Sequence, residues 1–151
     1  MATDAERHTP AHLWIVGILA TLWNAFGAYD YVMTRSRNTE YLESMMPGVN
    51  AGEFLAYIDG YPLWAQIGWG LGVWMGLLGS VLLLLRSRWA VHSFALSLLG
   101  MIMSFLYVFT GPPMPGEEAI GMMKYFPIVI VAIGVALLYY SWRQREKGVL
   151  R

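Results

Sequence analysis

Five polar side chains lie within or beside long apolar stretches, and they are the first candidates for chemistry: Asn24, Asp30, Gln66, Tyr107 and Lys124. A polar group inside lipid is costly, so one that occurs there is a functional candidate by default. At 1.5 Å per residue, Asn24 is about 16 Å into the first apolar stretch, near the midplane, and Asp30 is about 25 Å in, near its outer edge. Because Gln66, Tyr107 and Lys124 reach the same outer level, the sequence predicts an outer polar pocket in which Asp30 and Lys124 form an ion pair.

Asp30 fits two roles that the sequence does not separate. It is either a binding group for a small polar solute or a proton, or one half of a structural salt bridge or cap, since Arg35 follows little more than one helical turn later. Asn24 has the same two options, as a ligand or as an interhelical hydrogen-bond donor. Trp69, one of the deeper tryptophans, either stacks on a ligand in a cavity or packs against glycines.

Small residues recur every three or four positions along two consecutive apolar stretches: Gly68, Gly72, Gly76 and Ser80 in one, and Ser93, Ser97, Gly100 and Ser104 in the next. Spacing of four places residues on one helix face, and small side chains let two helix backbones approach closely in lipid. The tight turn expected between the two stretches favours packing within the chain. A homodimer seam is the alternative.

The composition argues against several classes of function. The formal net charge is zero, so no global basic field attracts nucleic acid. The chain has no cysteine and only three histidines, which argues against a disulfide, a thiol nucleophile or a metal site. It contains no Walker loop, helical zinc motif or nucleophile elbow. We therefore expect neither an enzyme nor a bound cofactor.

Four apolar stretches must position these residues, and each is long enough to cross a membrane: 13–33, 63–85, 89–109 and 125–142. Hydrophobic residues make up 57% of the chain and charged residues only 13%, well below the share of about 25% that is usual in soluble domains. About 20 apolar residues in a helix span a hydrocarbon core of about 30 Å. The first stretch has features of a signal peptide, but it continues to Met33, so we expect a retained helix.

Basic residues indicate the orientation of the predicted spans. Seven, including Arg7, lie on the side of the two termini and three on the other, which by the positive-inside rule predicts cytoplasmic termini. On the outer side, residues 34–62 form the largest segment between spans. Asn50 and Glu53 fit a capping box ahead of an apolar run, so we expect a short amphipathic helix on the outer membrane face, with a solvent loop as the alternative. Residues 143–151 are expected to form a cytoplasmic tail.

Nearly the whole chain resembles a family of small proteobacterial inner-membrane proteins. The shared features are Trp23-Asn24, Gly27-Ala28, Asp30-Tyr31-Val32-Met33, Gly60-Tyr61-Pro62 and the turn Arg86-Ser87-Arg88-Trp89-Ala90. Members are often labelled sugar transporters, and no activity is established for them. The resemblance implies four helices in a bacterial inner membrane. The small half-transporters of sugars differ from this chain, because they have three helices per unit and a Pro-Gln pair that this sequence lacks.

The sequence thus predicts an all-α membrane protein, an antiparallel bundle of four transmembrane helices with a short amphipathic segment on its outer face. The expected partners are the lipid bilayer and a small polar solute, and no nucleic acid. The function we favour is a small-molecule carrier or binder with a pocket around Asp30. The alternative is an accessory or scaffold subunit that packs against a larger membrane complex or forms a homodimer through the glycine stripe.

Overall fold

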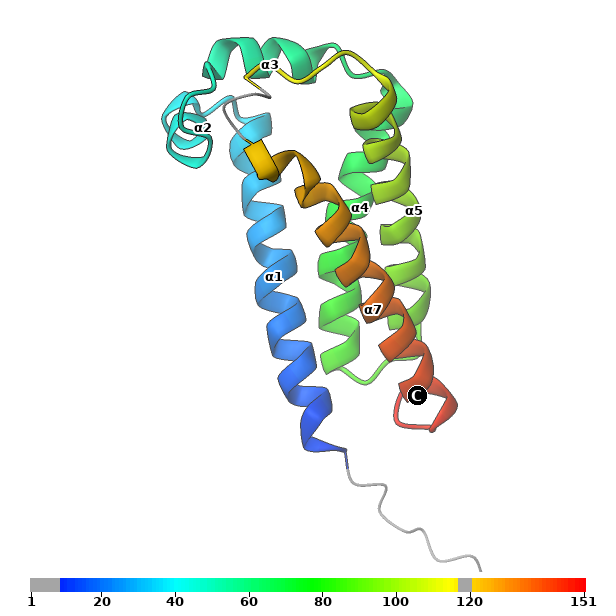
Figure 1. The fold of residues 1–151 in the computed structure, drawn as a ribbon. Helices are drawn as coiled ribbons and strands as arrows, with labels where there is room; N and C mark the ends of the chain where they lie inside the picture. The colour runs from blue at the N-terminus through cyan, green and yellow to red at the C-terminus, as the bar shows by residue number, and fades with distance from the viewer. Residues whose placement is uncertain (1–8, 117–120) are drawn as a thin grey trace, which may run out of the picture.

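The computed structural model of this chain describes residues 9–116 and 121–151, and all the regular secondary structure of those residues is helical (Figure 1). The fold consists of four long helices, and short helices lie in two of the three connections between them. The elements are α1 (Ala11–Arg35), α2 (Thr39–Met45), α3 (Ala51–Asp59), α4 (Leu63–Leu84), α5 (Trp89–Thr110), the 3-10 helix η1 (Gly121–Tyr125) and α7 (Phe126–Glu146). Arg7, one of the basic residues used to predict the orientation, lies outside the described residues.

The four long helices α1, α4, α5 and α7 are long and apolar enough to cross a membrane. They contain 25, 22, 22 and 21 residues, and at 1.5 Å per residue even the shortest measures about 31 Å. Much of their surface is apolar and faces outward, as expected for helices whose solvent is lipid. The chain is therefore a multi-pass membrane protein. The helices lie close to the predicted spans: α1 begins two residues earlier and ends two residues later, α4 ends one residue earlier, α5 ends one residue later, and α7 begins one residue later and continues to Glu146.

Each long helix packs against its neighbour in the chain: α1 against α4, α4 against α5, and α5 against α7. The closest pair is α4 and α5, which are joined by a tight turn. In this turn the amide of Ser87 donates to the Leu82 carbonyl at 2.8 Å, and Arg86 adopts a left-handed backbone conformation with φ of 58°. The turn leaves the two helices side by side over their whole length (Figure 1).

The contact between α4 and α5 is made by the small residues of both helices. A Cβ placed on Gly100 of α5 would stand 2.5 Å from the amide nitrogen of Gly72 and 2.6 Å from the carbonyl oxygen of Gly68 on α4. Two α5 hydroxyls cross the same contact, because Ser97 donates to the Gly72 carbonyl at 2.6 Å and Ser93 donates to the Met75 carbonyl at 2.7 Å. The glycine face of α4 is therefore already covered by a helix of its own chain.

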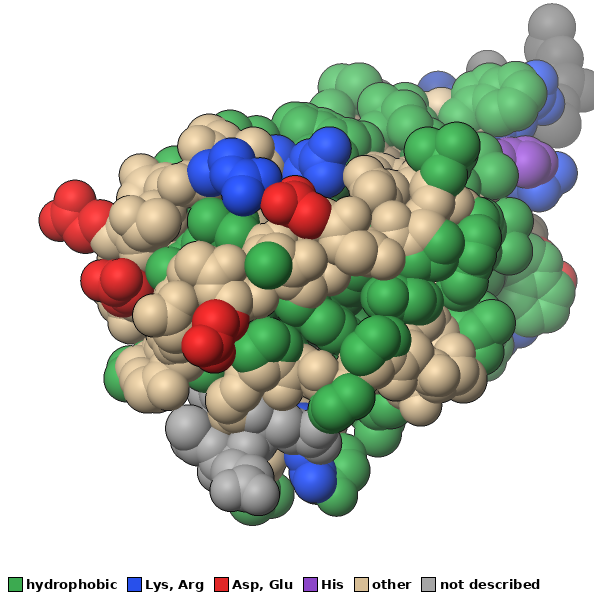
Figure 2. Space-filling view, turned by 90° about the horizontal axis from the view of Figure 1, so that it is seen from above, with side chains coloured by type: hydrophobic (Ala, Val, Ile, Leu, Met, Phe, Trp, Pro, Cys, Tyr) green, Lys and Arg blue, Asp and Glu red, His purple; other side chains and the backbone are tan. Residues whose placement is uncertain are grey.

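The short helices α2 and α3 lie across one end of the four long ones (Figure 1). Both begin at an asparagine whose side chain accepts a hydrogen bond from the chain three residues on, Asn38 from Tyr41 N at 2.9 Å and Asn50 from Glu53 N at 3.0 Å. The Asn50 cap follows the predicted capping box, whereas α2 was not predicted as a separate helix. Seen from this end, acidic, basic and hydrophobic side chains share the surface (Figure 2).

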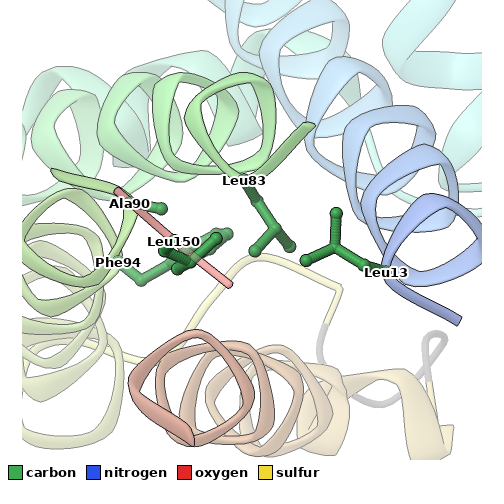
Figure 3. Close-up of a cluster of buried hydrophobic side chains, with 5 residues drawn as sticks. All are labelled: Leu13, Leu83, Ala90, Phe94 and Leu150. Carbon is green, nitrogen blue, oxygen red and sulfur yellow. The ribbon is translucent and has the colours of Figure 1, made fainter. Parts of the chain in front are cut away.

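The opposite end is closed by a buried apolar cluster, named here the lower cluster: Leu13, Leu83, Ala90, Phe94 and Leu150 (Figure 3). Leu150 belongs to the segment 143–151, which was predicted to be a tail. That interpretation needs revision, because α7 continues to Glu146 and the remaining residues fold back onto the turn at 86–88. The amide of Arg88 donates to the Arg151 carbonyl at 2.8 Å, and the amide of Arg151 donates to the Arg86 carbonyl at 2.7 Å.

Gly148 makes this return possible. Its φ of 68° is a left-handed conformation that favours glycine. Its amide donates to the Arg145 carbonyl at 2.9 Å and that of Val149 to the Gln144 carbonyl at 3.0 Å, the paired bonds of a Schellman motif. The reversal directs Leu150 into the lower cluster, where it is only 4% exposed. The C-terminus is therefore a packed part of the fold.

Candidate functional site

A cavity of about 350 Å³ lies between α1, α4, α5 and α7 and beneath α2 and α3, and we refer to it as the main cavity. Three of the predicted site residues line it: Asn24, Asp30 and Trp69. Its other polar lining side chains are Thr34, Ser97 and Ser104. Most of the remaining wall is aromatic or aliphatic, with contributions from Trp23, Phe26, Phe54, Val73, Phe94, Met101, Phe105, Phe126, Ile133 and Leu137.

Asp30 meets a neutral donor rather than a cation. The Tyr41 hydroxyl of α2 donates to Asp30 Oδ1 at 2.9 Å. Burial and this hydrogen bond raise the pKa of Tyr41 above its usual range, so the phenol stays protonated and able to donate. The predicted ion pair with Lys124 does not form. The alternative partner Arg35 instead directs its Nη1 to Gln66 Oε1 at 3.3 Å.

Asn24 and Trp69 form parts of two other walls of the main cavity. The amide nitrogen of Asn24 donates to the Ala20 carbonyl of its own helix at 2.8 Å. Its carbonyl oxygen lies against Gly76 of α4, where a glycine leaves room for it. Trp69 packs edge-to-face on Tyr31 with ring centroids 4.7 Å apart. Asn24 and Trp69 thus each contact a neighbouring helix and also line the main cavity.

A second cavity of about 380 Å³ adjoins the first and carries Lys124, the other charged member of the predicted pocket. The two cavities share four lining residues: Phe54, Trp69, Ser104 and Phe105. The ammonium of Lys124 lies 5.3 Å from the centre of the Tyr125 ring, within the range of a cation–π contact. The predicted single pocket is therefore two neighbouring cavities, with Asp30 in one and Lys124 in the other.

Gln66 and Tyr107 line neither of these cavities. Both instead hold the turn that joins α3 to α4. The amide nitrogen of Gln66 donates to the Tyr61 carbonyl at 2.9 Å, and the Tyr107 hydroxyl donates to the Gly60 carbonyl at 3.2 Å. The ring of Tyr61 is buried against that of Tyr107, with centroids 4.7 Å apart. The structure thus gives these two predicted ligands structural contacts.

The main cavity has a distinct boundary on each side. Its floor meets the lower cluster, since Phe94 and Leu137 belong to both. Its roof is formed by Leu42, Met45 and Met46 of the α2 region, together with Phe54 of α3. Between α1 and α7 the wall is one side chain thick, because Phe26 and Phe126 line the cavity and are also 50% and 47% exposed.

Two side-chain contacts bridge α1 and α7 along this thin wall. Near the floor, His12 Nδ1 and the Tyr140 hydroxyl share a hydrogen bond of 2.6 Å. Higher up, the rings of Trp23 and Phe126 lie 6.2 Å apart. Since α1 packs mainly on α4, and α7 mainly on α5, α1 and α7 meet chiefly through side chains such as these.

Sequence reasoning missed Tyr41, the partner of Asp30, and the apolar roof residues around it. The available signal was Asn38, which fits a helix cap three residues before Tyr41. Ser97 and Ser104 were predicted only as packing residues, and they also line the main cavity. In the part of the chain that the structure describes, no group of three or more His, Cys, Asp or Glu residues is arranged to hold a metal ion.

Comparisons of the chain with family models, with curated protein sequences and with solved structures found no match. The features of the molecule that bear on its function are therefore the cavities and the side chains that line them.

Proposed function

We propose that this protein binds a small molecule in the main cavity and acts as a membrane carrier or binder. The observation that carries this proposal is a cavity of about 350 Å³ whose wall contains a carboxylate, Asp30, with no cationic partner among the described residues. Sites for small molecules are typically cavities of about 300–1,000 Å³ with mostly apolar walls and a few polar groups. The competing structural role for Asp30 was a salt bridge or a cap, and the salt bridge would require a cation of the chain beside the carboxylate.

We further propose an antiparallel bundle in a bacterial inner membrane, with α2 and α3 on the outer face and the termini in the cytoplasm. Basic residues support this orientation under the positive-inside rule. Six of the described Lys and Arg residues belong to the turn at 86–88 or to the C-terminal segment that packs on it: Arg86, Arg88, Arg143, Arg145, Lys147 and Arg151. At the α2–α3 end the described basic residues are Arg35, Arg37 and Lys124.

The scaffold function has less support. Its suggested docking face was the glycine stripe of α4, and Gly68 and Gly72 lie against the backbone of α5 within the same chain. Gly76 in turn lies against Asn24 of α1. A partner protein would have to displace one of these helices to use that face.

A thermal-shift screen with a matched pair of variants tests the proposed function. Val73→Trp fills the main cavity, whereas Ile67→Trp adds the same side chain to the same helix at a position that is 55% exposed and outside the cavity. The panel contains small cations, anions, sugars and neutral amphiphiles. We expect at least one class to stabilise the wild type and Ile67→Trp but not Val73→Trp. Equal shifts in all three proteins, or none, would favour the scaffold.

A further inference from the structure

We propose that the ligand of the main cavity is a lipophilic organic cation, whose charge pairs with Asp30 and whose apolar part rests on the aromatic walls. This inference rests on the proposed function and names its substrate class. Three properties of the cavity carry it: the sign of its charge, the placement of the nearby basic residues, and the aromatic character of its walls.

Among the described residues that line the main cavity, Asp30 is the one that carries a charge, and no Lys or Arg is among them. The carboxylate accepts one hydrogen bond from Tyr41, a donor without charge. A carboxylate that is partly removed from water is stabilised by a nearby positive charge, and leaving it without one is costly. The charge of the cavity therefore favours a cation and disfavours an anion.

The three described basic residues at the α2–α3 end of the molecule have other partners. Arg35 directs its guanidinium to Gln66, and Arg37 forms a salt bridge with Asp59 through bonds of 3.0 and 3.1 Å. Lys124 lies over Tyr125 and lines the adjoining cavity. These three described cations thus have partners other than Asp30, which leaves the position beside the carboxylate to a ligand.

Aromatic rings surround the rest of the space: Trp23, Phe26, Phe54, Trp69, Phe94, Phe105 and Phe126. The face of an aromatic ring attracts a cation, and more strongly where water is excluded. Polar groups that would recognise a sugar are few. The Ser97 hydroxyl already donates to Gly72, and the Asn24 amide nitrogen already donates to Ala20. These walls suit an apolar cation better than a solute with many hydroxyls.

Calorimetric titration of the full-length protein in lipid nanodiscs tests this inference with three aromatic probes of similar size. Phenyltrimethylammonium carries a positive charge, tert-butylbenzene has the same shape without charge, and benzenesulfonate is negative. We expect the cation to bind most tightly. Asp30→Asn removes the negative charge that attracts the cation, so it should weaken cation binding by about tenfold, which corresponds to about 1.4 kcal/mol. Asp30→Glu, which keeps the charge, should bind the cation more tightly than Asp30→Asn.

Asp59→Asn is the matched control, because it removes an exposed acidic residue at the same end of the molecule. It should bind the cation like the wild type. The inference is overturned if Asp30→Asn binds the cation as tightly as the wild type does, or if either other probe binds the wild type at least as tightly. If binding of that other probe is lost in Val73→Trp, the proposed function stands and only the cation class fails. If Val73→Trp binds every probe like the wild type, both proposals fail.

Discussion

A single methyl group at Gly100 should destabilise the whole bundle, because the site faces backbone. The new Cβ of Gly100→Ala would stand 2.5 Å from the Gly72 amide nitrogen and 2.6 Å from the Gly68 carbonyl oxygen. Ordinary contacts of carbon begin at about 3.5 Å, so α4 and α5 must separate by about 1 Å. Backbone atoms of a packed helix cannot rotate away as a side chain does. The separation would also stretch the bond from Ser97 to the Gly72 carbonyl, now 2.6 Å.

The expected loss of stability is the sum of three contributions, two that destabilise the fold and one that stabilises it. Overpacking a tight contact costs about 1–3 kcal/mol. Weakening the Ser97 hydrogen bond adds about 0.5–1.5 kcal/mol. The higher helix propensity of alanine returns about 1 kcal/mol. We therefore expect Gly100→Ala to lower the free energy of unfolding by about 0.5–3.5 kcal/mol.

Unfolding by sodium dodecyl sulfate in mixed micelles measures this change, with Gly27→Ala as the control. A Cβ on Gly27 would meet no heavy atom within 4 Å. The control should therefore match or exceed the wild type in stability, by up to about 1 kcal/mol. The particle mass should stay the same in both variants if the glycine face packs within the chain. Gly100→Ala with wild-type stability, or a change from dimer to monomer, would refute this account of the α4–α5 contact.

Three further changes test the two ends of the bundle. Asn50→Ala removes the cap of α3, so amide hydrogen exchange should report a free energy of opening of α3 that is lower by about 1 kcal/mol. Unchanged exchange would mean that the cap does not stabilise the helix. Leu150→Ala should lower the free energy of unfolding by about 2–5 kcal/mol. The control Leu85→Ala should change it little, because Leu85 is 71% exposed. Equal effects of the two changes would contradict the packing of the C-terminal residues. Tyr41→Phe removes the hydrogen bond to Asp30, so amide hydrogen exchange should report a free energy of opening of α2 that is lower by about 1 kcal/mol. Unaltered exchange would show that this hydrogen bond does not stabilise α2.

The long helices could be predicted because a helix that crosses a lipid bilayer needs about 20 consecutive apolar residues, and such a run is visible directly in the sequence. Short helices depend on a few local groups and are harder to find. The Asn50 cap precedes a clear apolar run, and α3 begins there. By contrast, α2 has seven residues of mixed polarity, and its formation depends on the Asn38 cap and on packing against α3. Packing of that kind is not visible in the sequence.

The sequence allowed a prediction of the level at which each candidate residue lies along its helix, but not of the direction in which its side chain points. Counting residues placed Asp30, Gln66 and Tyr107 at one level of the membrane. Which way each side chain points depends on how its helix is rotated about its axis, and neighbouring helices set that rotation. Gln66 and Tyr107 therefore turned out to hold the turn before α4 instead of lining the main cavity. The return of the C-terminus was missed although Gly148 followed by Val149 and Leu150 fits a helix-ending motif.

Thiol labelling in proteoliposomes tests the central claim, a ligand-accessible cavity beside Asp30, most directly. The chain has no cysteine, so Val73→Cys and Ile67→Cys each carry a single thiol on α4, one lining the main cavity and one 55% exposed on the outer surface of the helix. Maleimides react with the thiolate, which forms in a hydrated cavity and not in lipid. The account predicts that N-ethylmaleimide labels Val73→Cys and leaves Ile67→Cys unlabelled. An unlabelled Val73→Cys, or faster labelling of Ile67→Cys, would contradict it.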